Sequence, residues 1–75
     1  MNSPVQLDCC GHFCPVPIIM TEEKLLELKP GEVLEVVFTD PGAKPDLQMW
    51  CKVTGNKFLE FRSERMKYFA TIRKK

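Results

Sequence analysis

Cys14 is the residue whose type and surroundings most clearly predict chemistry in this chain. The run Cys14-Pro15-Val16-Pro17 is typical of a helix start, because proline is tolerated in the first turn, where backbone N–H groups lack intrahelical partners. A cysteine at the N-cap would face the positive end of the helix dipole, which lowers the pKa of a thiol below its free value of about 8.5. Val16 and Ile18 keep N–H groups that are free to face the sulfur, since the prolines have none. A cysteine that merely fills space beside a helix start is the alternative interpretation. The paired prolines and the Gly11 loop favour a functional, catalytic Cys14, an exposed thiolate able to hold a further sulfur atom as a persulfide, although the spacing alone does not choose the function.

Two more cysteines and a histidine lie just before this run and leave alternatives open. Adjacent Cys9 and Cys10 are unsuited to a mutual disulfide, because Cα atoms about 3.8 Å apart fall short of the usual spacing of about 4.4–6.8 Å. As accessory residues, either one could attack the inner sulfur of a Cys14 persulfide, releasing sulfide and leaving a disulfide. His12 could assist as a base or a cation, although a solvated loop histidine is the simpler interpretation.

The same thiols and imidazole could also be interpreted as a zinc site. Structural zinc sites usually pair two short clusters far apart in sequence, and Cys51 is the one distant thiol available. Cys51 lies beside Trp50 on the apolar face of an expected helix, so a small buried core residue is the favoured interpretation. We expect neither a metal site nor a cofactor.

Proline, glycine and apolar spacing predict the first half of the framework around Cys14. The segment from Val5 to Asp8 predicts an opening strand, and Gly11 then breaks the chain. The helix that begins at Cys14 ends at Pro30-Gly31. Its expected apolar side consists of Val16, Ile18, Met20, Leu25, Leu26 and Leu28.

The second half predicts a strand, a helix and a hairpin. Glu32 to Thr39 is rich in β-branched residues and predicts a central strand buried on much of both sides. Pro45 suits the first position of a second helix that ends at Gly55. Residues 57–62 and 68–73 alternate at period two around a polar turn, which indicates a hairpin. The side chains expected on one face of the second helix are Leu47, Trp50, Cys51 and Thr54. This order predicts an α/β fold, a two-layer α/β sandwich (βαβαββ) whose four-stranded mixed sheet has both helices on one face.

Length and charge limit the class of protein. A chain of 75 residues has room for a single domain, residues 1–75. Its 11 basic and 10 acidic residues leave a net charge of +1, which does not indicate nucleic-acid binding. The N-terminal run 1–4 lacks the basic start of a secretory signal, and no apolar run approaches the roughly 18 residues that span a bilayer. We expect a cytoplasmic protein whose cysteines stay reduced.

The run Leu7-Asp8-Cys9-Cys10-Gly11-His12-Phe13-Cys14-Pro15-Val16-Pro17 resembles the N-terminal motif of TusA-like (SirA-like) sulfur carriers. That motif is leucine, aspartate, two variable residues, glycine, two variable residues and Cys-Pro-x-Pro, so Asp8 and Gly11 count as supporting residues. The resemblance extends to about Arg73. Later matches are Asp40-Pro41-Gly42-Ala43, Asp46, Trp50 and Gly55. Cys9 and Cys10 depart from the pattern, since many relatives carry apolar or charged residues there.

This resemblance implies a carrier rather than an autonomous enzyme. Cys14 would accept sulfur as a persulfide from a cysteine desulfurase, a rhodanese or a thiosulfate-derived donor, and would pass it to an acceptor protein. The outlets known in the family include tRNA thiolation, molybdenum-cofactor biosynthesis and sulfur oxidation, and the motif does not choose among them.

The alternative is a small binding module for RNA or an acidic protein, without thiol chemistry. Its basic residues would be Arg62, Arg65, Lys67 and Arg73 around the hairpin. Because such a module requires neither the cysteine nor the prolines as they are placed, we expect no direct contact with nucleic acid.

Overall fold

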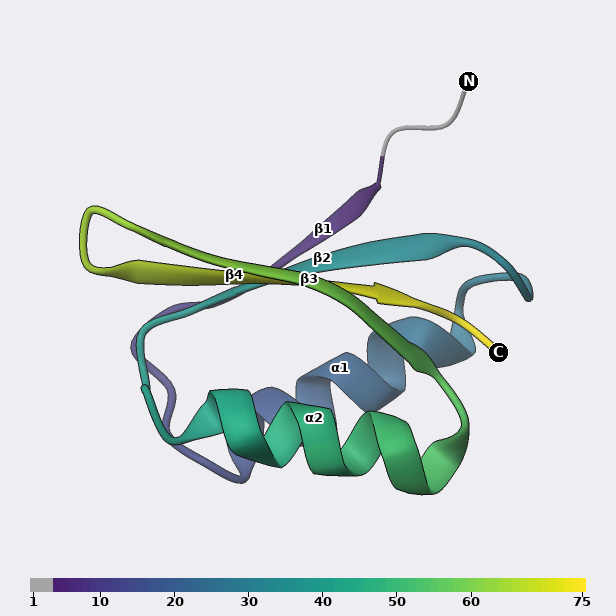
Figure 1. Ribbon diagram of the computed structural model, residues 1–75, viewed down its shortest axis with the longest axis horizontal. Coiled ribbons are helices and arrows are strands. Elements are labelled where there is room, and N and C mark those ends of the chain that lie inside the picture. Colours follow the sequence, from purple (N-terminus) through teal and green to yellow (C-terminus); the bar gives the residue numbers. More distant parts are fainter. Residues whose placement is uncertain (1–3) are drawn as a thin grey trace.

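The computed structural model describes residues 4–75, which form a four-stranded sheet and two helices (Figure 1). Residues 1–3, where we noted no basic start of a secretory signal, lie outside this range. The elements are β1 (Val5–Cys9), α1 (Val16–Leu26), β2 (Val33–Phe38), α2 (Ala43–Thr54), β3 (Lys57–Glu64) and β4 (Lys67–Arg73). The predicted order βαβαββ is confirmed.

The sheet is mixed, with strand order β1-β2-β4-β3. β1 and β2 are parallel, so a crossover must join them, and α1 supplies it. β4 runs antiparallel to both β2 and β3. Both helices lie on the same side of the sheet (Figure 1). This arrangement confirms the two-layer sandwich and the central position of β2.

The core fills the space between the sheet and the two helices. It is built by alternate residues of the inner strands and by one stripe of each helix. Its fully buried members include Leu34, Val36, Phe38, Leu47, Cys51, Ala70 and Ile72. The prediction that Cys51 is a buried core residue is confirmed, since its exposed fraction is 1%.

The packing of α1 differs from the expected apolar side. Leu26 and Val16 are 76% and 38% exposed, so the apolar side of the helix is packed less broadly than we expected. Thr21 is instead completely buried, and its hydroxyl has no hydrogen-bond partner among residues 4–75. The buried stripe of the helix consists of Pro17, Thr21 and Leu25, which lie four residues apart on one face. Leu26 lies one residue, about 100°, further round.

The ends of α2 follow from two local interactions. The helix begins at Ala43 rather than at Pro45, because Asp40 accepts N–H groups at its start: its Oδ1 accepts from Gly42 at 3.0 Å and its carbonyl accepts from Ala43 at 3.0 Å. It ends at Gly55, whose φ of 87° is left-handed and whose N–H donates to the Cys51 carbonyl at 2.9 Å.

Candidate functional site

Cys14 lies in the connection between β1 and α1, and its side chain is exposed. Helix α1 begins at Val16 with Pro15 at the N-cap, so Cys14 is one residue outside the position we predicted. The Cys14–Pro15 peptide bond is cis. The expected free donors are also occupied, which corrects that prediction: the Val16 N–H donates to the Phe13 carbonyl at 2.9 Å, and the Ile18 N–H to the Pro15 carbonyl at 3.1 Å.

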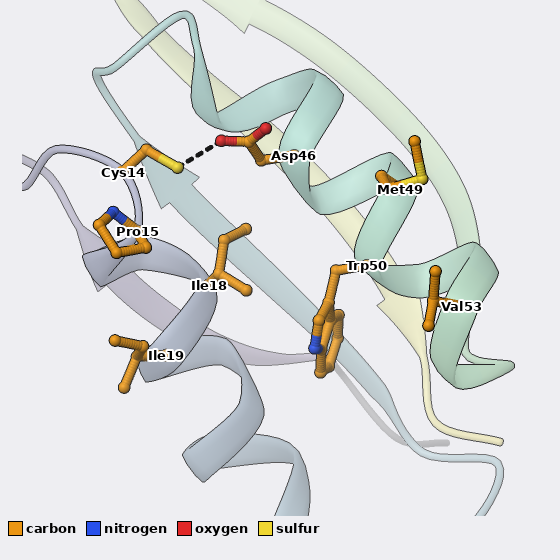
Figure 2. Close-up of a pocket in the computed structure, with 8 residues that line it drawn as sticks. All are labelled: Cys14, Pro15, Ile18, Ile19, Asp46, Met49, Trp50 and Val53. Atoms are coloured by element: carbon orange, nitrogen blue, oxygen red, sulfur yellow. Dashed lines mark hydrogen bonds between the residues drawn. The ribbon is translucent and has the colours of Figure 1, made fainter.

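The partner of the Cys14 sulfur is a carboxylate from the other helix. Its Sγ donates a hydrogen bond to Oδ2 of Asp46, in the first turn of α2 (Figure 2). This bond, with burial and the negative charges of Asp46 and Asp40, raises the pKa of the Cys14 thiol to about 11. The predicted lowering of this pKa was therefore wrong, because the hydrogen bond to Asp46 and the charges of two nearby carboxylates favour the protonated thiol. This raised pKa favours the protonated thiol at neutral pH.

Asp40 and Thr39 attach the Cys14 segment to the connection between β2 and α2. The Cys14 N–H donates to Oδ2 of Asp40 at 2.9 Å, while Oδ1 of the same carboxylate caps the start of α2. The Gly11 N–H donates to Oγ1 of Thr39 at 3.0 Å. Gly11 has a φ of 81°, a left-handed conformation that favours glycine over other residues. These bonds place Cys14 beside the first turn of α2.

A shallow apolar groove runs between α1 and α2, away from the thiol (Figure 2). Its volume is about 410 Å³. The lining residues are Cys14, Pro15, Ile18, Ile19, Asp46, Met49, Trp50 and Val53. Ile19, Met49 and Val53 remain 48%, 63% and 76% exposed, although they are apolar. The site therefore combines a polar end, where Cys14 meets Asp46, with a strip of uncovered apolar side chains.

The accessory residues differ in accessibility. Cys9 is the last residue of β1 and is completely buried, and burial raises the pKa of its thiol to about 11. It is therefore a core residue, and β1 extends one residue beyond the strand from Val5 to Asp8 that we predicted. Cys10 is half-buried, its N–H donates to Oδ1 of Asp8 at 2.9 Å, and burial and Asp8 raise its thiol pKa. His12 is exposed, and its backbone N–H donates to the Cys9 carbonyl at 3.3 Å.

The four cysteines all lie within residues 4–75 and are free thiols. Across the same residues, no three histidine, cysteine or acidic side chains are grouped so that they could hold a metal ion.

Two site residues were missed by the sequence analysis. Asp40 and Asp46 were noted only as matches to a motif, and neither was given a chemical role. The available signal was the presence of two carboxylates around a predicted helix start, but nothing in the local sequence connects them to Cys14. The contact becomes visible only once α2 is folded against α1.

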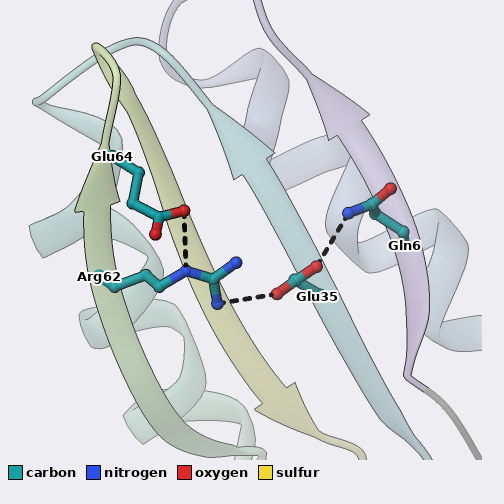
Figure 3. Close-up of polar contacts among 4 residues, drawn as sticks. All are labelled: Gln6, Glu35, Arg62 and Glu64. Carbon is teal, nitrogen blue, oxygen red and sulfur yellow. Dashed lines mark hydrogen bonds and ion pairs between the residues drawn. The ribbon is translucent and has the colours of Figure 1, made fainter.

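The far face of the sheet carries polar contacts that bear on the alternative of a binding module (Figure 3). Arg62 pairs with Glu35 at 3.2 Å and with Glu64 at 3.5 Å, and its guanidinium lies 4.2 Å from the centre of the Phe69 ring. Phe61 and Tyr68 pack toward Phe38 in the core. These contacts occupy Arg62 and the rings of Phe61, Tyr68 and Phe69. Arg65, Lys67 and Arg73 are exposed, and no ion pair found within residues 4–75 includes them. The hairpin therefore keeps exposed cations but offers few free aromatic faces on which bases could stack.

Comparisons of this sequence with a family model and with curated proteins all indicate the same family. Residues 5–74 match the family described as Sulfurtransferase TusA. The chain is 38% identical over 77 aligned positions to the sulfur carrier protein TusA of Pseudomonas paraeruginosa, covering 100% of this chain and 98% of that protein. It is 41% identical over 71 residues to the putative sulfur carrier protein YrkF of Bacillus subtilis, covering 92% of this chain.

A solved structure agrees with these sequence matches. The crystal structure of a SirA-like protein from Desulfitobacterium hafniense has a TM-score of 0.75 and 26% identity, covering 92% of this chain and 95% of that one. Two curated relatives are much longer: the chain spans 38% of the length of YrkF and 34% of that of a putative sulfur carrier protein of Aquifex aeolicus. Within residues 4–75, neither helix has the length and apolar character needed to cross a membrane. The match over residues 5–74, the relatives and the shared fold together mean that the chain belongs to the sulfurtransferase TusA family of sulfur carriers.

Proposed function

We propose that this chain carries sulfane sulfur as a persulfide on Cys14, taking it from a donor protein and passing it to an acceptor protein. The observation that carries the proposal is the exposed Cys14 thiol at the end of an uncovered apolar groove, in a chain that belongs to a sulfur-carrier family. Cys14 is the catalytic residue of this proposal. Cys9 and Cys51 are buried, and Cys10 is half-buried.

The transfer needs no cofactor and no net oxidation. In loading, the Cys14 thiolate attacks the outer sulfur of the donor's persulfide, a new S–S bond forms on Cys14, the donor's S–S bond breaks, and the donor cysteine leaves as a thiolate. In unloading, the acceptor's thiolate attacks the outer sulfur on Cys14 in the same way. The proton lost from Cys14 in loading ends on the departing thiolate of the donor or on solvent.

The environment of Cys14 favours a carrier over an autonomous enzyme. Its polar neighbours are the carboxylates of Asp40 and Asp46, which hold the thiol and cap a helix. The sulfur is exposed, and the apolar side chains of Met49 and Val53 further along the groove remain uncovered. A cysteine desulfurase, a rhodanese or a thiosulfate-derived donor could load such a site. A reducing compartment such as the cytoplasm suits the free thiols.

The test is to incubate the protein with a cysteine desulfurase and cysteine, and to record intact masses without reductant. We expect a reducible gain of about 32 Da for each sulfur atom added. Wild type and Cys10→Ser should gain this mass, and Cys14→Ala should not. Thiosulfate with a rhodanese provides the second donor.

The result that contradicts the proposal is an unmodified wild-type protein with both donors, while Cys14 still reacts with an alkylating agent. RNA binding that falls steeply with salt and is unaffected by Cys14→Ala would then favour the binding module.

A further inference from the structure

We propose that the proteins that exchange sulfur with Cys14 present a lysine or arginine beside their own reactive cysteine, and that this cation pairs with Asp46 and releases the Cys14 sulfur. This inference rests on the proposed function and names the chemistry of the partner surface. It makes Asp46 a positioning residue that acts through Cys14.

The first step concerns the two carboxylates at the site. Both oxygens of Asp40 accept backbone N–H groups, from Cys14 and from Gly42, so this carboxylate is held by the fold. Asp46 is exposed. Within residues 4–75, the hydrogen-bond partner of its carboxylate is the Cys14 thiol. Asp46 can therefore exchange its partner without disturbing the backbone.

The second step concerns the positive charges of the chain. The ion pairs found within residues 4–75 join Lys24 to Glu27 and Arg62 to two glutamates, and none of them includes Asp46. Lys44, in the same helical turn as Asp46, lies 4.2 Å from the centre of the Phe61 ring. The negative charge around the Cys14 sulfur is thus left without a cation from the described residues.

The third step follows from the chemistry of exchange. The attacking species is a thiolate, whereas the Asp46 hydrogen bond and charge favour the protonated thiol. A cation that binds Asp46 offsets this negative charge and removes the acceptor of the thiol hydrogen bond. Because the chain does not place such a cation, the partner must bring it.

The fourth step concerns how the cation is oriented. The apolar groove continues from Asp46 along Met49 and Val53 of α2, and faces Ile19 of α1 (Figure 2). A partner segment could insert an apolar side chain into this groove. Residues next to that side chain in the partner's sequence could then reach the end of the groove where Cys14 and Asp46 lie. The surface therefore fits a segment that carries an apolar residue, a cation and a thiol close together.

The experiment uses three small disulfides that differ in charge: cystamine is cationic, bis(2-hydroxyethyl) disulfide is neutral, and dithiodiglycolate is anionic. Each reacts with the Cys14 thiolate to give a mixed disulfide and one free thiolate, which intact mass and released thiol report. A Cys10→Ser background leaves Cys14 as the exposed thiol. At low salt we expect cystamine to react about tenfold faster than the anionic reagent, and we expect 0.5 M salt to reduce this ratio.

Variants of Asp46 separate a positioning role from a merely structural one. In Asp46→Asn the preference for cystamine should fall to about twofold or less, because the attracting charge is gone. The midpoint of Cys14 alkylation against pH should also move to a lower pH than in wild type, because the Asp46 hydrogen bond and charge that raise the Cys14 pKa are removed. Asp46→Glu should restore the charge preference. The matched control, Glu22→Gln, removes an exposed carboxylate of α1 and should leave both readouts unchanged.

Equal rates with the three disulfides in wild type, or an unchanged preference in Asp46→Asn, would overturn this inference. Mass analysis of the same preparations after sulfur loading keeps the two proposals separate. A Cys14 that gains sulfur but shows no charge preference overturns this inference alone. A Cys14 that prefers cystamine but gains sulfur from neither donor overturns the proposed function alone.

Discussion

Cys9 and Cys10 are adjacent in the sequence, yet they differ sharply in environment. Cys9 is the last residue of β1, points into the core and is completely buried, whereas Cys10 turns away and is half-buried. This difference follows from the alternation of side chains along a strand. A resolving attack on a Cys14 persulfide by Cys9 would require β1 to detach from the core.

Alkylation should therefore separate the two thiols in the native protein. We expect iodoacetamide to modify Cys14 and Cys10 and to leave Cys9 unmodified until the protein unfolds, because burial excludes the reagent and raises the pKa of the Cys9 thiol. Peptide mapping of the alkylated protein checks this. Modification of Cys9 at the same rate as Cys10 would contradict the burial of Cys9.

The sequence predicts the position and exposure of Cys14, but not its protonation. Proline and glycine residues mark the helix start and the loop before it. The N-cap predicted from them, Cys14, lies one residue before the observed N-cap, Pro15. The hydrogen bonds from Cys14 to Asp40 and Asp46 span 26 and 32 residues. Contacts between elements so far apart depend on how α1 packs beside α2, which helical periodicity alone does not determine.

At the scale of elements, the β3–β4 hairpin has a tight turn made from unusual residues. Arg65 and Met66 join the strands, and their φ values are 48° and 66°. Two successive positive φ values are typical of a type I′ turn, for which Asn-Gly is strongly preferred. The sequence analysis predicted a longer turn, because neither residue gives a turn signal. The hairpin was still predicted correctly, since the alternation of its two strands is strong.

Replacing this turn should stabilise the protein. We expect Arg65→Asn/Met66→Gly to raise the free energy of unfolding by about 1 kcal/mol, since both new residues adopt left-handed conformations at lower cost. Urea denaturation followed by circular dichroism measures the change. Arg65→Ala/Met66→Ala is the control and should not stabilise. A loss of stability in the Asn-Gly variant would show that the native side chains make contacts that outweigh the backbone strain.

At the scale of the whole molecule, buried thiols connect stability to pH. Burial raises the pKa of both Cys9 and Cys51 from 9.0 to about 11. A pKa that is higher in the folded state means that the folded protein holds the proton more tightly than the unfolded chain. The contribution to stability is complete below about pH 9 and is lost as the pH rises toward 11.

The free energy of unfolding should therefore decrease between about pH 9 and pH 11. We expect a loss of about 2 kcal/mol for each of the two buried thiols at pH 11. Other groups titrate in this range, so the informative quantity is the difference between wild type and Cys51→Ala, measured by urea denaturation with reductant. Wild type should lose stability more steeply than the variant. Parallel pH profiles would contradict the effect of burying Cys51.

The overall fold was the part that the sequence predicted best, because βαβαββ order and short connections leave few arrangements of a mixed sheet. Helix faces were predicted less well. Thr21 is buried and Leu26 is exposed, since the packing angle of α1 and not hydrophobicity decides which side faces the sheet.

The groove beside Cys14 also has a kinetic consequence. The sulfur lies at one end of a shallow groove of about 410 Å³, whose lining side chains come from α1, α2 and the segment just before α1 (Figure 2). Two macromolecules that approach the same sulfur through the same groove exclude each other sterically. Donor and acceptor would then compete for the protein and not form a ternary complex with it. Raising the concentration of either one beyond saturation would slow the overall flux of sulfur, because each carrier molecule must dissociate from one before it can bind the other.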